Sequence, residues 1–316
     1  MDLFLGVDGG QSSTIAVIGD ETGRVAGWGA GGPCNHVTGP EGREKFVHAL
    51  TESVGAACAR AGVSLAAVEF RAACFGLSGG AEDKRALIAE LVRTRDVVLE
   101  IDAVVALAGA TGGEPGIITI AGTGSIAFGR NAAGKTARAG GWGYVFGDEG
   151  GGFDLARQGL RAALRYEEGW GPKTMLHALY LEAAGAKSAN EVLHKFYSTD
   201  FSRPRIASFG RFVGKAALEA DAVANGILLK AAAQLAALAS AVRRQLFEPG
   251  AAVRVAHMGG AFQSALLREQ FRLLVEQEQG NICGPPLYAP AAGALLEAYR
   301  AAGLKPQLSN IPDIKK

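Results

Sequence analysis

The chain has 316 residues, of which 48% are hydrophobic, and a formal net charge of +1. That length and hydrophobic content are sufficient for two domains, each with its own core. Because acidic and basic residues are mixed along the chain, nucleic acid and anionic membrane surfaces are disfavoured as partners, and a small-molecule substrate is favoured.

The cysteines and the N-terminus indicate a cytoplasmic protein. Four cysteines, at positions 34, 58, 74 and 283, are far apart, form no CxxC pair and are expected to be reduced core thiols. The opening residues MDLFLGVDGG contain no basic segment followed by a long apolar one, as a secretory signal would. No apolar run approaches the length of a membrane span.

The N-terminal part is predicted to begin with three short strands and to continue with alternating helices and strands. Apolar runs bounded by Gly, Ser and Asp indicate strands, and apolar residues at helical spacing indicate helices. The expected elements are strands at Leu3–Val7, Thr14–Ile18 and Val25–Gly29, a helix at Glu41–Ala61, a strand at Val68–Leu77, a helix at Ala81–Thr94 and a strand at Val97–Ile101.

A repeat of the first three strands follows. When Ile117–Gly143 is laid on them with an offset of 111 residues, Ile15 corresponds to Ile126 and Gly23 to Gly134. Both copies read strand, Gly/Ser/Thr turn, strand, short turn, strand. The duplication predicts two domains built on one plan, each presenting a turn rich in hydroxyl groups.

The rest of the chain is predicted to be mostly helical. Helices are expected at Asp154–Arg165, Lys173–Gly185, within Arg205–Leu246, at Ser264–Glu278 and at Pro290–Ala302, with one strand at Ala252–His257. We place an N-terminal domain at residues 1–111, with helix 290–302 as a candidate to pack back on it. A C-terminal domain spans residues 112–289, and residues 303–316 form a loose tail.

One motif is interpreted as a false match. Gly129–Thr136 spells GRNAAGKT, which satisfies the P-loop pattern GxxxxGK[ST]. A P-loop needs a helix directly after it, because the amides of the helix N-terminus hold the phosphates. Thr136 is followed by ARAGGWG, which does not favour a helix, and the repeat places the motif opposite the turn GDETGR. We therefore predict an ordinary hairpin turn.

Several motifs occur together in one order. They are LGVDGGQSST (Leu5–Thr14), FGLSGG (Phe75–Gly80), Asp102 after a strand, AGTGS (Ala121–Ser125), GGWGYVFGDEGGG (Gly140–Gly152) and MGGAF (Met258–Phe262). With them the chain resembles, over roughly Leu3 to Ala302, the BadF/BadG/BcrA/BcrD ATPase family of the acetate and sugar kinase, heat-shock and actin superfamily. Within that family it is similar to the N-acetylglucosamine kinases.

The resemblance implies an α/β fold of two ribonuclease H-like, actin-like ATPase domains with an interdomain cleft. It also implies ATP and Mg²⁺ as cofactors and phosphorylation of the 6-hydroxyl of an amino sugar, with N-acetylglucosamine as the first choice. Glucosamine and N-acetylmuramic acid are open alternatives as substrates. We expect no nucleic-acid or membrane partner. We expect the protein to form a homodimer.

Two other classes of function are open. The first is an activator-type ATPase that drives a partner enzyme. Its electron-transferring members carry cysteines that bridge an iron–sulfur cluster, whereas Cys283 has no clustered partner. The second is a nucleotide-binding regulator, which would need no catalytic base, so that Asp8 and Asp102 together argue against it.

Asp8 and the following turn are candidates for metal and phosphate binding. A carboxylate beside amides and hydroxyls can hold a hydrated Mg²⁺ against polyphosphate, so Asp8 is expected to bind Mg²⁺ through water. A plain Asp-Gly-Gly turn is the alternative. By the resemblance, the nucleotide and its phosphates contact Asp8, Gly9, Gly10, Gln11, Ser12, Ser13 and Thr14, the matching turn Gly122, Thr123, Gly124 and Ser125, and Ala217, Gly259 and Gly260.

Asp102 is the candidate catalytic base. It follows an apolar strand, where α/β folds gather ligand groups. By the resemblance, Asp102 orients the sugar hydroxyl and accepts its proton. A helix N-cap for the segment Ala103–Ala110 is the alternative.

Candidate sugar contacts complete the predicted site. Neutral sugars are bound by directed hydrogen bonds and an apolar face, which suits Asn, Ser, Asp and Trp side chains. Ser78 could instead cap a helix, Trp142 could belong to the core, and Glu149 could shape its loop or reach the metal. The residues that match family positions around the sugar are Asn35, Ser78, Gly79, Gly141, Trp142, Gly143, Asp148 and Glu149.

Overall fold

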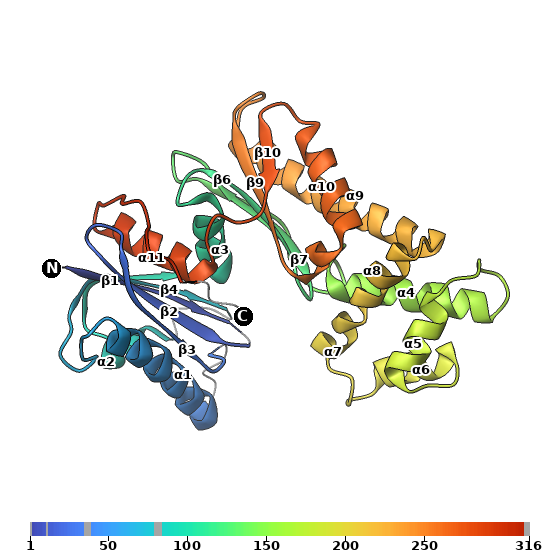
Figure 1. Ribbon diagram of the computed structural model, residues 1–316, viewed down its shortest axis with the longest axis horizontal. Coiled ribbons are helices and arrows are strands. Elements are labelled where there is room, and N and C mark those ends of the chain that lie inside the picture. The colour runs from blue at the N-terminus through green and yellow to red at the C-terminus, as the bar shows by residue number, and fades with distance from the viewer. Residues whose placement is uncertain (1, 11, 35–38, 79–83, 313–316) are drawn as a thin grey trace. The chain divides into compact units, whose positions relative to one another are not determined.

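The computed structural model describes residues 2–10, 12–34, 39–78 and 84–312. The chain divides into two compact units (Figure 1). Unit 1 comprises Met1–Glu114 and Pro286–Lys316, and unit 2 comprises Pro115–Pro285. Each unit is built around one five-stranded sheet.

The sheet of unit 1 has the order β3-β2-β1-β4-β5. The first three strands are antiparallel, and β1, β4 and β5 are parallel to one another. Parallel neighbours place the carboxyl ends of β1, β4 and β5 at one edge of the sheet. The strands are β1 Leu3–Gly9, β2 Thr14–Asp20, β3 Val25–Gly31, β4 Phe70–Leu77 and β5 Thr94–Glu100.

The sheet of unit 2 has the same plan, with the order β10-β9-β6-β7-β8. Here β6, β7 and β8 are antiparallel, and β6, β9 and β10 are parallel. The strands are β6 Gly116–Ala121, β7 Ser125–Arg130, β8 Thr136–Gly140, β9 Val253–Met258 and β10 Asn281–Gly284. The predicted repeat is thereby confirmed. The GRNAAGKT motif spans the end of β7, a turn and the start of β8, so it forms a hairpin and not a P-loop.

Helices cover both faces of the sheet in unit 1. Strand β1 alternates accordingly: Leu5 and Val7 join the core under α1, whereas Phe4 joins the core under α11. Helix α11 comes from the far end of the chain and packs on β1, β4 and α3. The helices are α1 Gly39–Arg60, α2 Arg85–Leu91, α3 Asp102–Thr111 and α11 Pro290–Ala301.

Glycines permit the close approach of α11. A Cβ atom on Gly6 of β1 would lie 2.1 Å from the Leu295 amide nitrogen, and one on Gly293 would lie 2.0 Å from the Val105 carbonyl oxygen. Neither distance is possible for a real side chain. The small residues therefore bring the C-terminal helix into direct backbone contact with β1 and α3.

Unit 2 is richer in helices than unit 1. Helix α9 packs against β6, β7, β8 and α10, and its buried Leu228, Leu235 and Val242 lie in the core of this unit. Among the described helices, α9 alone is long and apolar enough to cross a membrane by length and composition, so the expectation that no apolar run approaches that length was wrong. In the structure, α9 packs on the sheet of unit 2. The helices are α4 Gly152–Glu167, α5 Leu176–Ala184, α6 Ala189–Tyr197, α7 Arg203–Ser208, α8 Gly210–Leu218, α9 Ala222–Leu246 and α10 Ala265–Glu276, with a 3₁₀ turn η2 at Gly260–Gln263.

Some elements differ from the predictions. The helical stretch predicted at Arg205–Leu246 is three helices, because Asp221 caps the start of α9 by accepting a hydrogen bond from the Ala224 amide at 2.9 Å. Helix α6 and strand β10 were not predicted. Residues 303–312, expected as part of a loose tail, pack on unit 1: Leu308 is buried, and the Val25 amide donates to the Ser309 carbonyl oxygen.

Candidate active site

In unit 1 the candidate site residues follow adjacent parallel strands. The register places Asp8 of β1 beside Gly76 of β4, and Gly76 beside Glu100 of β5. Ser78 and Asp102 therefore extend from the same edge of the sheet as Asp8. The sheet brings together in unit 1 the metal, sugar and catalytic candidates that the sequence places far apart.

Asp8 and the turn after it are tightly fixed. Asp8 is buried at the end of β1, and the Gly10 amide closes the turn by donating to the Ser13 carbonyl oxygen at 3.0 Å. A Cβ atom on Gly9 would lie 2.4 Å from the Cys34 sulfur, so glycine is required there. This constraint exceeds what an ordinary Asp-Gly-Gly hairpin turn needs.

The hydroxyl groups of this turn differ in accessibility. Thr14 is buried, and its hydroxyl donates to the Gly32 carbonyl oxygen at 2.7 Å. Ser12 is exposed, and Ser13 is half-buried. The geometry favours Ser12 and Ser13 over Thr14 as phosphate contacts.

Asp102 is the first residue of α3, and it is exposed. The N-cap position belongs to Ile101, which makes no side-chain capping bond. The explanation of Asp102 as the N-cap of this helix is therefore wrong. A carboxylate in the first helical turn still interacts favourably with the helix dipole, and its exposure leaves it accessible to a substrate.

Ser78 is hydrogen-bonded to Gly9 and to Lys84, a lysine that was not identified from the sequence. The Ser78 amide donates to the Gly9 carbonyl oxygen at 3.1 Å. Lys84 is fully buried, and its Nζ donates to the Ser78 carbonyl oxygen at 2.9 Å. A lysine is seldom buried without partners, but nothing in its local sequence distinguishes Lys84 from a surface lysine.

In unit 2 the turn Gly122–Ser125 is hydrogen-bonded to the start of α4. The Gly152 amide donates to the Gly122 carbonyl oxygen at 2.7 Å, and the Phe153 amide donates to that of Thr123 at 3.0 Å. A Cβ atom on Gly151 would lie 2.7 Å from the Gly124 carbonyl carbon. The glycines of the GDEGGG motif therefore allow the two backbones to touch.

Asp148 and Glu149 fix the other side of this turn. The Ser125 amide donates to Asp148 Oδ1 at 3.2 Å, and the Ser125 hydroxyl donates to the Glu149 carbonyl oxygen at 2.6 Å. Asp148 is buried, has a φ of 62° and forms an ion pair with Arg203. The Asp148 carboxylate thus supports the turn. Arg203 was not identified from the sequence, because it lies 55 residues away from Asp148.

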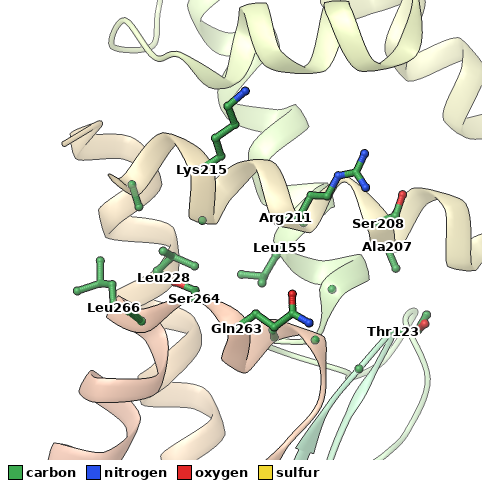
Figure 2. Close-up of a pocket in the computed structure, with 18 of the residues that line it drawn as sticks. Thr123, Leu155, Ala207, Ser208, Arg211, Lys215, Leu228, Gln263, Ser264 and Leu266 are labelled. Carbon is green, nitrogen blue, oxygen red and sulfur yellow. The ribbon is translucent and has the colours of Figure 1, made fainter. Parts of the chain in front are cut away.

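A cavity of about 840 Å³ opens beside this turn (Figure 2). Its volume lies in the usual range for small-molecule sites. Gly122, Thr123, Ala217 and Gly260, all predicted to contact nucleotide, line it. Gly259, the residue before Gly260, has a φ of 112°, and a Cβ atom on it would lie 2.4 Å from the Ala121 carbonyl oxygen.

The cavity also contains polar residues that the sequence did not indicate. Arg211 and Lys215 stand one helical turn apart on α8, and Figure 2 shows them extending from the same side of the helix. None of the described residues that line the cavity is acidic, so the lining favours an anionic ligand. The other polar side chains here belong to Thr123, Ser208, Gln263 and Ser264.

Trp142 is not a core residue. Its side chain is 64% exposed, and the Arg138 guanidinium lies 4.7 Å from its ring centroid. Gly141 and Gly143 on either side have positive φ angles of 72° and 80°. The turn therefore presents the Trp142 ring at the surface of unit 2, and the core interpretation is wrong.

Three predicted site residues lie outside the described part of the chain: Gln11, Asn35 and Gly79.

Each unit has the strand order and the helix-covered sheet of a ribonuclease H-like domain, so the chain is an α/β protein of the actin-like ATPase class. The chain belongs to the BadF/BadG/BcrA/BcrD ATPase family, whose profile matches residues 5–298.

Relatives cover nearly the whole chain. It is 33% identical to the N-acetylmuramic acid/N-acetylglucosamine kinase of Clostridium acetobutylicum, over 86% of this chain and 90% of that protein. It is 27% identical to the N-acetyl-D-glucosamine kinase of Dictyostelium discoideum, over 78% and 80%. A solved structure from Chromobacterium violaceum, described as a candidate N-acetylglucosamine kinase, superposes with a TM-score of 0.73 at 26% identity, covering 94% of this chain and 98% of that one.

Proposed function

We propose that this protein is an ATP-dependent kinase that phosphorylates the 6-hydroxyl of an amino sugar, with N-acetylglucosamine as the preferred substrate. The observation that carries the proposal is the pair of matching turns after β1 and β6. One of them lies beside a cavity whose lining, among the described residues, includes cationic and no acidic side chains. The kinases of the same family support the reaction class and the type of sugar.

ATP is assigned to the cavity of unit 2. The adenosine part would lie against Ala217, Gly259 and Gly260, and the phosphates would extend to the turn Gly122–Ser125. Backbone amides and hydroxyls in such a turn stabilise the charge that develops during phosphoryl transfer. Arg211 and Lys215 would add positive charge on the cavity wall.

Asp102 is assigned as the base, and Asp8 as the residue that holds Mg²⁺ through water. The buried Asp8 carboxylate and the serine hydroxyls beyond it are oxygen ligands, the type that Mg²⁺ prefers. When bound, the ion would neutralise charge on the β- and γ-phosphates. Asp102 would orient the sugar hydroxyl and accept its proton.

Each unit contains residues that the sequence predicts to contact the sugar. Ser78 is hydrogen-bonded to Gly9, the residue after Asp8, and the exposed Trp142 ring is suited to cover the apolar face of a hexose. The described residues assigned to sugar binding are Ser78, Gly141, Trp142, Gly143 and Glu149, and Asn35 and Gly79 complete the set as predictions from the sequence. Asp148, also predicted to contact the sugar, is assigned instead to support of the turn Gly122–Ser125, because its buried carboxylate is bonded to Ser125 and Arg203. Glucosamine and N-acetylmuramic acid are the alternative substrates.

The activator-type ATPase is the second candidate and is less well supported. Cys283 lies buried in β10, and burial raises the pKa of its thiol to about 12. A neutral core thiol is a poor ligand for an iron–sulfur cluster, which is held by thiolates. We also propose that the protein acts in the cytoplasm as a homodimer, without nucleic-acid or membrane partners.

An ATP-consumption screen tests the proposal. The purified protein is incubated with MgATP and, in turn, N-acetylglucosamine, glucosamine, N-acetylmuramic acid, glucose and mannose, and ADP formation is followed by a coupled assay. Turnover with N-acetylglucosamine above all other sugars is the expected result. Equal ADP formation with and without every sugar would contradict the kinase function and support the activator class.

A further inference from the structure

Arg203 connects three parts of unit 2 that surround the turn Gly122–Ser125, to which the phosphates of ATP are assigned. It is the first residue of α7, and the following Pro204, Ala207 and Ser208 line the cavity. Its Nη2 donates to Asp148 Oδ2, and its guanidinium carbon lies 5.1 Å from the ring centroid of Tyr144. One side chain therefore contacts the loop that follows Trp142 and the carboxylate that supports the turn.

Asp148 is the link between Arg203 and the turn. Its carboxylate accepts from the Ser125 amide on one oxygen and from Arg203 on the other. A Cβ atom on Gly124 would lie 2.3 Å from Oδ2, so the carboxylate lies directly against the turn. Asp148 is buried and has a positive φ angle, and a buried carboxylate that lost its cation would be strongly disfavoured in this place.

We propose that Arg203 is a positioning residue for phosphoryl transfer. By holding the Asp148 carboxylate against Gly124 and Ser125, it fixes the position of the turn that would bind the phosphates of ATP. By stacking on Tyr144, it ties the loop 142–146 to the same point. Arg203 thus couples the cavity wall, the phosphate turn and the assigned sugar loop, and this role rests on the proposed kinase function.

The test compares Arg203→Met with Arg205→Met. Arg205 lies on the same helix, stacks over Phe201 at 3.9 Å and donates one hydrogen bond to the Asp200 carbonyl oxygen. Each substitution removes one stacking contact and one hydrogen bond, but only Arg203 reaches Asp148.

The expected result is a loss in kcat of about 100-fold for Arg203→Met, because a small displacement of a positioned group has an effect of that size. The KM values for ATP and sugar should change by about fivefold at most, since the loss falls on the transition state. Arg203→Lys keeps the charge, and its kcat should be about tenfold higher than that of Arg203→Met. Arg205→Met should remain within about threefold of the wild type.

A double-mutant cycle with Asp148→Asn identifies the path of the effect. If Arg203 acts through Asp148, the kcat of the double variant should be at most about threefold lower than the kcat of Arg203→Met. Losses that multiply, or an Arg203→Met kcat equal to that of Arg205→Met, would overturn the proposal. If Arg203→Met does not fold, Arg203→Lys and Asp148→Asn carry the test, and wild-type kcat in both would overturn it.

The wild type in the same assay separates the two proposals. An active wild type with an unaffected Arg203→Met variant would contradict the role of Arg203 alone. A wild type that forms no sugar phosphate would contradict the kinase function, and the role of Arg203 with it.

Discussion

At the scale of single residues, Asp102 has the clearest assignment to chemistry. It is exposed, it stands at the carboxyl edge of the parallel strands of unit 1, and Ile101 occupies the N-cap position that would otherwise explain it. Asp8, which extends from the same sheet edge, is buried and backed by a turn that requires glycine. The two carboxylates therefore have different environments, as a base and a metal-holding group would.

Replacing Asp102 with Asn should lower kcat by about 10³-fold, because the amide cannot accept the proton of the sugar hydroxyl. The affinity for ATP should remain within about twofold of the wild type, since Asp102 is assigned to the sugar and not to the nucleotide. Steady-state kinetics and calorimetric titration with a non-hydrolysable ATP analogue check the two parts. Unchanged turnover would remove Asp102 from the mechanism.

Local patterns made part of the site predictable from the sequence. Asp8 and the turn Gly122–Ser125 follow apolar strands directly, so strand and glycine signals were sufficient to find them. Residues brought in by tertiary packing could not be found in this way: Arg203 meets Asp148 across 55 residues, and Lys84 looks like a surface lysine until its burial is seen. The sequence could not decide between a core and a surface position for Trp142, because an aromatic residue gives the same signal in a core and on a binding surface.

At the scale of elements, the end of α8 and the start of α9 shape one side of the cavity in unit 2. Ala217 and Leu218 of α8 and Leu228 of α9 line it. Asp221 lies between the helices, where its carboxylate accepts from the Ala224 and Met175 amides and the Thr174 hydroxyl. Burial opposes ionisation of Asp221, but these hydrogen bonds outweigh it and lower its pKa below the ordinary value of 3.8.

Asp221→Ala should lower the free energy of unfolding by about 1–2 kcal/mol at pH 7, the usual effect of removing an N-cap. Because the folded pKa is depressed, the contribution of the Asp221 charge is complete above pH 3.8 and is lost as the pH falls through the folded value. The difference between variant and wild type should therefore shrink in acid. Urea titrations at pH 7 and about pH 3 measure it.

The exposed Asp200, which has no side-chain partner among the described residues, provides the control as Asp200→Ala. An Asp221→Ala variant as stable as this control at pH 7 would contradict the capping role.

At the scale of the whole molecule, the chain must return to its starting unit to complete it. Unit 1 takes its second helical layer in part from α11, which lies almost two hundred residues after α3 and packs against it. Tyr299 of this helix stacks on Phe4 and donates to the Asp20 carbonyl oxygen at 2.6 Å. Unit 2 is thereby inserted into the sequence of unit 1, and the chain crosses between the units twice.

Gly293→Ala tests how tightly the returning helix is fitted. The added methyl group would meet the Val105 carbonyl oxygen, so the free energy of unfolding of unit 1 should fall by about 3 kcal/mol. Gly55→Ala is the matched control in α1, where the structure has no atom within 4 Å of an added Cβ. There alanine should stabilise by up to about 1 kcal/mol. Equal stability of both variants in chemical denaturation would show that the fit of α11 is looser than described.

The central claim is that the γ-phosphate is transferred to a sugar and not to water. Phosphorus-31 NMR of a mixture of the protein, MgATP and N-acetylglucosamine measures this directly. We expect a phosphomonoester signal, coupled to the protons at C6 of the sugar, that grows in step with ADP. Growth of inorganic phosphate with ADP, with the sugar unchanged, would contradict the account.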